Sequence, residues 1–309
     1  MNINKAIHNW YKILIYFSLL SVFVYILNSD FFFVPNVKST GYLLISLLFL
    51  FIGFLFDSFN WGAYLKKRKS KQINYADSLV SHGITIFSKY IPGKIWMIIG
   101  RAGFIANKYN FSTKQLSLIS FEVQIISLWS GLIVSSVTLF FLQDSEYFLI
   151  LLIGIFCLLI GLSIFLFTNV FQKILQVLIK KLFKIDFTNK KPEITIYNLI
   201  GFYATWVMWS LSFYFLEKAL FDREIILITG LAFVFAANIG LVAIIFPGGI
   251  GIREGILVAI LINFEFTIAE ATTISLVSRL WFLSGEVFIF LTSLIIQKFK
   301  PRRYFFKYL

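Results

Sequence analysis

Residues 147–168 read YFLILLIGIFCLLIGLSIFLFT, a run that contains no charged side chain. A helix needs about 20 apolar residues to cross a lipid bilayer, and this run is long enough to do so. Comparable apolar runs occur at about 11–28, 42–65, 116–141, 194–217, 225–246 and 272–297, with weaker stretches at 75–105 and 250–264. The sequence therefore predicts an all-α, polytopic membrane bundle of about six to eight transmembrane helices.

The overall composition also favours lipid as the surroundings of this chain. Hydrophobic residues make up 59% of the 309 residues and charged residues only 14%, whereas a soluble domain carries about 25% charged residues. The apolar character extends along the whole chain, so we expect a single membrane domain over residues 1–309. The run at 11–28 has no small-residue cleavage site after it, and it is expected to remain as a first span.

The net charge of +13 could suggest a nucleic-acid partner, but the distribution of the basic residues argues against one. They lie in short clusters between apolar runs, which is the positive-inside pattern of plasma-membrane proteins. Acidic residues dominate the intervening loops at 29–41, 143–146, 217–224 and 265–270. This alternation predicts a multi-pass protein of the bacterial inner membrane with both termini in the cytoplasm. The basic segment 169–191 and the tail 298–309 are expected to lie on the cytoplasmic leaflet.

Two stretches do not fit this alternation as single crossings. The stretch 75–105 begins and ends on the inside, which predicts a re-entrant hairpin. The stretch 225–264 begins and ends on the outside, so it either dips and returns or crosses twice. Residues 11–141 and 147–297 then read as two halves of opposite orientation, with their Pro-Gly pairs 155 positions apart. The pattern predicts an inverted repeat, in which broken helices from each half form a site near the midplane.

The first break lies in residues 88–96, SKYIPGKIW. Pro92 cannot continue a helix and Gly93 permits unusual backbone angles, so the pair ends a helix inside this stretch. Lys89, Lys94 and Arg101 surround the break with positive charge, and a lipid head group with a phosphate is their natural partner. The alternative is an interfacial loop whose lysines contact lipid phosphates in general.

The second break lies in residues 246–255, FPGGIGIREG. The residues that break this helix are Pro247, Gly248, Gly249 and Gly251. Arg253 and Glu254 open the next helix inside an apolar stretch, where ionisable side chains are costly and mark functional sites. We predict that they take part in head-group binding. The alternative is a structural pair, which could extend to Arg279 or Glu286, that locks the helices together.

Other polar side chains inside the apolar runs predict an intramembrane network. Its members are Asp57, Glu122, Arg279 and Glu286. A structural salt-bridge network is the first interpretation, and proton transfer by Glu122 or Glu286 is the alternative. The chain has one cysteine and two histidines, too few for a thiol or multi-histidine metal site, so no metal and no cofactor are expected. Enzyme motifs are not found, and no catalytic residue is assigned.

The two motifs resemble the transmembrane flippase domain of lysylphosphatidylglycerol synthases and its stand-alone homologues. The resemblance rests on residues 89–96 with Arg101, and on the more specific PGGIGIREG at 247–255. It implies a helical domain that moves aminoacylated phosphatidylglycerol, or another lipid such as a polyprenyl-linked saccharide, between leaflets. Those synthases carry a cytoplasmic aminoacyl-transferase domain after the membrane part, whereas the sequence here ends at Leu309. A stand-alone role in cell-envelope biogenesis is therefore expected.

Three functional hypotheses follow from these observations. The first is a flippase-like transporter of a lipid with a phosphate-containing head group. The second is a membrane scaffold that recruits a glycosyltransferase or aminoacyl-transferase through the basic segments 66–71 and 173–191. The third, a membrane transferase acting on a lipid phosphate, ranks last because no acid–base or metal set is visible in the sequence.

Overall fold

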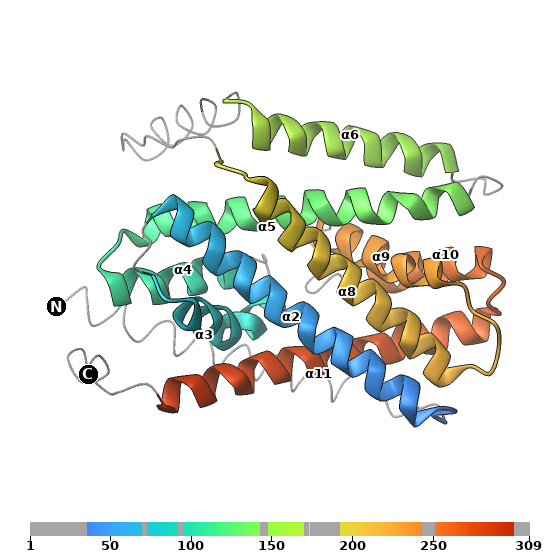
Figure 1. The fold of residues 1–309 in the computed structure, drawn as a ribbon. Coiled ribbons are helices and arrows are strands. Elements are labelled where there is room, and N and C mark those ends of the chain that lie inside the picture. The colour runs from blue at the N-terminus through green and yellow to red at the C-terminus, as the bar shows by residue number, and fades with distance from the viewer. Residues whose placement is uncertain are drawn as a thin grey trace.

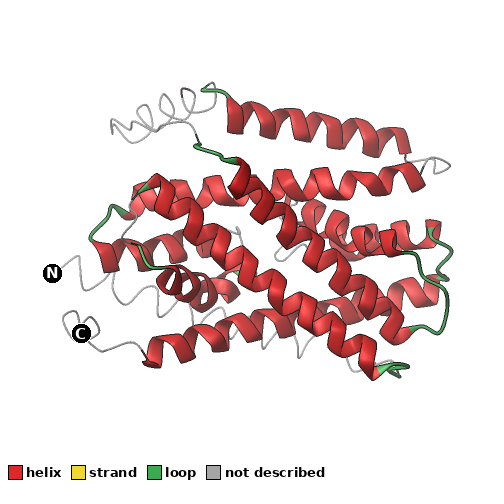
Figure 2. Cartoon of the chain, in the orientation of Figure 1, coloured by secondary structure: helices red, strands yellow, loops and turns green. Residues whose placement is uncertain are grey.

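The computed structural model describes residues 36–69, 73–91, 95–142, 148–169, 173, 192–242 and 251–299. All the regular elements in these ranges are helical (Figure 2), so the predicted all-α fold is confirmed for the described part of the chain. The expected first span 11–28, nearly all of the expected surface segment 169–191, and the expected tail beyond Phe299 lie outside the described residues.

Five of the described helices are long and apolar enough to cross a membrane. They are α2 (Thr40–Arg68), α5 (Thr113–Ser135, continued by the 3-10 helix η2, Ser136–Phe141), α6 (Phe148–Phe167), α8 (Ile196–Leu220) and α11 (Ile268–Phe299). Their bounds follow the predicted apolar runs closely, because the thickness of the hydrocarbon layer fixes the length of a span. The chain is thus a multi-pass membrane protein.

Two pairs of short helices complete the bundle. The first pair is α3 (Tyr75–Thr85, followed by the 3-10 helix η1, Ile86–Tyr90) and α4 (Trp96–Tyr109). The second is α9 (Gly230–Val242, preceded by η3, Leu227–Thr229) and α10 (Ile252–Asn263). At 1.5 Å per residue these helices are about 20 Å long, well short of a hydrocarbon layer of about 30 Å. The lengths favour the dip-and-return alternative for 225–264. Figure 1 shows the two pairs at opposite ends of the bundle.

Small polar side chains form hydrogen bonds between α2 and α8 where these helices cross at the centre of the fold (Figure 1). The Ser46 hydroxyl donates to the Ser212 carbonyl at 2.7 Å, and the Ser212 hydroxyl donates to the Ser46 carbonyl at 2.5 Å. Further along, the Asn60 amide donates to the Thr205 hydroxyl at 3.0 Å. Trp281 of α11 donates to the Ser46 hydroxyl at 2.8 Å. Lipid supplies no hydrophobic drive between helices, so close packing and such hydrogen bonds stabilise the bundle.

Helix α6 lies at the periphery, against α5 (Figure 1). Only Ile155 and Leu166 of its side chains are buried, and Trp129 of α5 donates to the Ser163 hydroxyl at 2.9 Å. The remaining surface of α6 is strongly apolar, with a mean hydropathy of 3.1 in its most apolar window. We conclude that most of α6 faces lipid.

One predicted boundary differs from the structure. Glu217 was expected in an outer loop at 217–224, but α8 continues to Leu220 and the Glu217 side chain is fully buried. The Thr229 hydroxyl donates to its carboxylate. In a sequence, a charged residue near the end of an apolar run predicts the start of a loop. Only the fold shows that a hydroxyl from η3 donates a hydrogen bond to this carboxylate.

Candidate functional site

Charged residues of both short-helix pairs meet on one face of α11. One cation from each pair lies close to the ring of Phe282 in α11. The Lys89 ammonium, from η1 in the first pair, lies 5.0 Å from the centre of this ring, and the Arg253 guanidinium carbon, from α10 in the second pair, lies 5.7 Å from it. The structure therefore brings together two predicted head-group residues that are 164 positions apart in the sequence.

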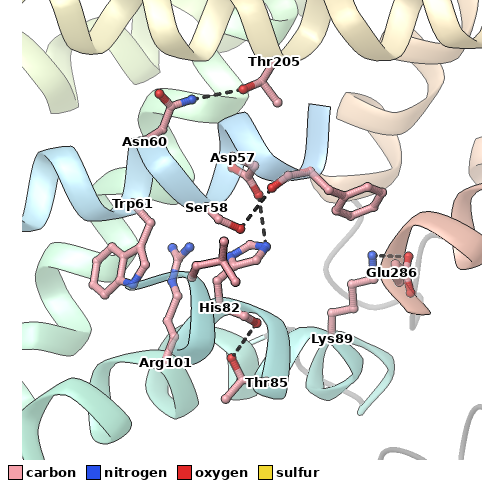
Figure 3. Close-up of polar contacts among 12 residues, drawn as sticks. Asp57, Ser58, Asn60, Trp61, His82, Thr85, Lys89, Arg101, Thr205 and Glu286 are labelled. Atoms are coloured by element: carbon pink, nitrogen blue, oxygen red, sulfur yellow. Dashed lines mark hydrogen bonds and ion pairs between the residues drawn. The ribbon is translucent and has the colours of Figure 1, made fainter. Parts of the chain in front are cut away.

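Glu286 holds the first of these cations (Figure 3). Its carboxylate is fully buried and lies 2.5 Å from the Lys89 ammonium. The Tyr90 hydroxyl donates to the same carboxylate at 3.0 Å. A buried carboxylate that is paired and hydrogen-bonded in this way avoids most of its desolvation penalty, and the contact joins the first short-helix pair to α11.

Glu254 anchors the second pair to α11. Its carboxylate forms an ion pair with Arg279, and it also accepts a hydrogen bond from the backbone N–H of Gly251 at 2.7 Å. Gly251 has a φ of +83° immediately before α10, a backbone conformation that favours glycine. Glu254 thus caps the start of α10 and joins it to α11.

Arg253 points away from this ion pair. One of its terminal nitrogens donates to the Ser278 hydroxyl at 3.1 Å, and its guanidinium stacks 4.8 Å from the ring centre of Phe233. The Nε–H is buried without a hydrogen-bond acceptor. Within the described ranges no carboxylate forms an ion pair with Arg253. Among the described residues, this partly buried guanidinium is held by aromatic faces and a neutral hydroxyl, which leaves its charge available for an anion.

The whole cluster carries more positive than negative charge. Its cations are Lys89, Arg253 and Arg279, and its carboxylates are Glu254 and Glu286. Because each carboxylate already has a cation, the excess charge resides on Arg253. A phosphate is the kind of ligand that would balance it.

Arg101, also predicted as a head-group residue, occupies a different environment. It is 2% exposed and donates to the Ser120 hydroxyl at 2.6 Å and to the Ser120 carbonyl at 2.8 Å. Its guanidinium stacks on Trp61 at 4.7 Å. Figure 3 shows it beside Trp61 and on the other side of His82 from Lys89. These contacts join α4 to α5 and α2.

We expect Arg101→Lys to lower the stability of the bundle by about 1.5–3 kcal/mol, because an ammonium cannot make both contacts to Ser120 and cannot stack as a guanidinium does. Thermal unfolding in detergent, followed by tryptophan fluorescence, would measure the loss. Lys67→Met at an exposed position of α2 is the control. Equal midpoints for wild type and Arg101→Lys would show that these contacts do not hold the helices.

The four residues of the predicted network are distributed over separate ion pairs rather than one network. Glu286 and Arg279 belong to the cluster on α11. Asp57 of α2 lies 3.4 Å from the buried His82 ring (Figure 3). Glu122 of α5 lies 3.0 Å from Arg68 and accepts from the Tyr64 hydroxyl at 2.8 Å.

Several predicted residues lie outside the described ranges. They are Pro92, Gly93, Lys94, Pro247, Gly248 and Gly249. The sequence analysis did not single out Tyr90, Phe233, Ser278 or Phe282, since such residues are common in apolar runs and only the packing shows that they surround the charges. Within the described ranges, no group of three histidine, cysteine or acidic side chains could hold a metal ion.

Comparison with known proteins identifies the family. A family model described as the lysylphosphatidylglycerol synthase TM region matches residues 9–283. No curated protein and no solved structure gives a match. The matched range includes both Pro-Gly motifs and all the charged residues of the cluster except Glu286. The chain belongs to the family of the lysylphosphatidylglycerol synthase transmembrane region.

Proposed function

We propose that this protein is a flippase-like transporter that moves a lipid with a phosphate-containing head group between the leaflets of the bacterial inner membrane. The observation that carries the proposal is the partly buried Arg253, which has no carboxylate in an ion pair with it among the described residues. A cation of this kind inside a membrane bundle is costly, and it is retained where it binds a ligand or lines a pathway.

The arrangement of the short helices supports transport rather than simple binding. Each pair is too short to cross the bilayer, and the two lie at opposite ends of the bundle (Figure 1). Their charged residues meet on α11, where the Phe282 ring lies between Lys89 and Arg253. Transporters built from broken helices place the substrate at such a junction. Lys89 and Arg253 would contact the phosphate, and Glu254 would keep α10 in place.

The family suggests the class of lipid and the pathway. Aminoacylated phosphatidylglycerol and polyprenyl-linked saccharides both carry a phosphate, and both belong to cell-envelope biogenesis. We propose a role without covalent chemistry for this chain, with a membrane or cytoplasmic transferase as a partner in the same pathway.

The orientation of the bundle follows from its basic ends. Basic residues at described helix ends include Lys66–Arg68 of α2, Lys114 of α5 and Lys298 of α11. All three lie at the same end of the bundle (Figure 1). By the positive-inside rule this end faces the cytoplasm, which would also place both termini there.

A leaflet-exposure assay in vesicles tests the transport proposal. Labelled lysylphosphatidylglycerol and a labelled polyprenyl-phosphate sugar would be compared for wild type and Arg253→Ala. We expect wild type to move one of these lipids faster than empty vesicles do. Arg253→Ala should slow this movement by roughly 10- to 100-fold, the loss expected when a charge-assisted hydrogen bond to the ligand is removed.

Arg223→Ala is the matched control. Arg223 also stacks on a phenylalanine, with its guanidinium 4.6 Å from the Phe266 ring, and donates to the carbonyl of Glu265 at 2.9 Å. It lies in the loop after α8, away from the cluster, so its loss should leave transport unchanged. If wild type moves neither lipid, the transport proposal is wrong, and the scaffold alternative would predict capture of a transferase by the intact protein.

A further inference from the structure

Glu286 and Lys89 form an ion pair whose two members differ in accessibility. The Lys89 side chain is 27% exposed, whereas that of Glu286 is 1% exposed, and the two charged groups are 2.5 Å apart. An incoming phosphate can therefore reach the lysine but not the carboxylate. This inference rests on the proposed function, because it concerns the state in which a lipid phosphate binds to Lys89 in place of Glu286.

Loss of Lys89 would leave Glu286 as a buried carboxylate without a cation. Such a group costs several kcal/mol, and it is relieved by gaining either a proton or a new cation. Among the described residues, the polar and charged groups that face Glu286 are Lys89 and Tyr90 from η1, and Arg253 from α10 at longer range. From α2, the side chains packed near this part of α11 are the phenylalanines Phe51 and Phe54, which offer no charge.

Both nearby arginines already make contacts that they would have to give up in order to pair with Glu286 in place of Lys89. Arg279 is already paired with Glu254. Arg253 is held by Ser278 and by the ring of Phe233, and it contacts Phe282 from its own helix pair. To neutralise Glu286, Arg253 would have to leave these contacts, and it would then no longer be available to bind the phosphate.

We propose that Glu286 takes up one proton from water when the phosphate of an amine-free lipid binds to Lys89, so that lipid loading is coupled to proton uptake. The proton adds to a carboxylate oxygen, and the resulting hydroxyl becomes a donor in place of the ion pair. No bond of the lipid is made or broken. The proton leaves when the lipid leaves.

A lipid that carries its own amine should behave differently. The ammonium of a lysylated head group can pair with Glu286 directly, because it replaces the cation that the phosphate has taken. Proton uptake is then not required. The proposal thus predicts coupling for phosphatidylglycerol and none for lysylphosphatidylglycerol at the same site.

Glu122 provides a matched control within the same chain. It is also buried, at 2% exposure, and it also has one cation and one tyrosine hydroxyl, from Arg68 and Tyr64. It packs in the region where α2 and α5 meet, apart from the Phe282 cluster. If burial and pairing alone caused proton uptake, Glu122→Gln would alter it as much as Glu286→Gln.

The experiment measures protons and lipid binding together. Short-chain phosphatidylglycerol is added to the purified protein in weakly buffered detergent at neutral pH, with a pH indicator for proton uptake and calorimetry for binding. For wild type and Glu122→Gln we expect about one proton taken up per lipid bound. For Glu286→Gln we expect binding without uptake. Short-chain lysylphosphatidylglycerol should bind to wild type without uptake.

The outcomes separate this inference from the proposed function. If the wild type binds neither lipid, both are overturned. If phosphatidylglycerol binds without proton uptake, or if Glu286→Gln takes up protons as wild type does, only the coupling is overturned. Should Glu286→Gln fail to fold, Lys89→Met replaces it. In that variant lipid binding can no longer remove an ammonium from Glu286, so lipid that still binds should bring no proton uptake.

Discussion

Replacing Glu254 by alanine is expected to destabilise the bundle by about 3–5 kcal/mol, since the change leaves the charge of Arg279 buried without its carboxylate. Arg279 is only 9% exposed and Glu254 16% exposed, so water cannot take over the interaction fully. The same substitution removes the acceptor for the Gly251 N–H at the start of α10, which adds the cost of a lost helix cap, about 1 kcal/mol.

A double-mutant cycle tests this expectation. Glu254→Ala, Arg279→Met and the combination of both would be compared by thermal unfolding in detergent. The combination should be more stable than Glu254→Ala alone, because it removes the charge of Arg279 together with the carboxylate that pairs with it. Additive losses in the double variant would mean that Glu254 and Arg279 do not depend on each other, and that α10 is held to α11 by its apolar contacts.

Replacing Gly83 by alanine is expected to force the first short-helix pair away from α11. A Cβ at this position would lie 2.5 Å from the backbone carbonyl oxygen of Ile289, and closer still to the Ser293 hydroxyl oxygen. Backbone cannot move aside as the end of a side chain can. The Ser293 hydroxyl also donates to the Leu79 carbonyl at 3.2 Å, so the collision falls on the contact that joins α3 to α11. Overpacking of this kind costs about 1–3 kcal/mol, and sometimes more.

Gly154→Ala is the control, because a Cβ on Gly154 of α6 meets no other atom within 4 Å. Both variants add the same methyl group to a helix of the same protein. We expect a lower unfolding midpoint for Gly83→Ala and an unchanged or slightly higher one for Gly154→Ala, since alanine favours helix more than glycine does. Equal midpoints for the two variants would show that α3 can shift along α11 without cost.

The spans could be predicted from the sequence because lipid imposes a simple rule on them. A long helix must be apolar over the thickness of the bilayer whatever it packs against, and the run at 147–168 shows this without any knowledge of its neighbours. The helix breaks could also be predicted, since proline and glycine act through their own backbone, and Gly251 is the one predicted break residue that the structure describes. Gly251 indeed has the positive φ at the start of α10.

The pairing of the charges could not be predicted in the same way. Lys89 meets Glu286 across 197 positions, and this contact depends on how η1 lies against α11. Arg101 illustrates the same limit. Its charge beside a Pro-Gly break was the reason to expect a ligand, but Ser120 and Trp61 enclose it once α4 has packed against α5 and α2. Charge and spacing indicate which residues matter, whereas the partner is decided by packing between distant segments.

The ring of Phe282 has a consequence for the two sides of the membrane. It attracts one cation from each short-helix pair, and these pairs reach it from opposite ends of the bundle (Figure 1). When one pair withdraws, the ring and the neighbouring charges favour the approach of the other. If the protein transports lipid as proposed, the positions of the two pairs are then negatively correlated at this ring. A single aromatic side chain would in this way link the two pairs while a head group passes.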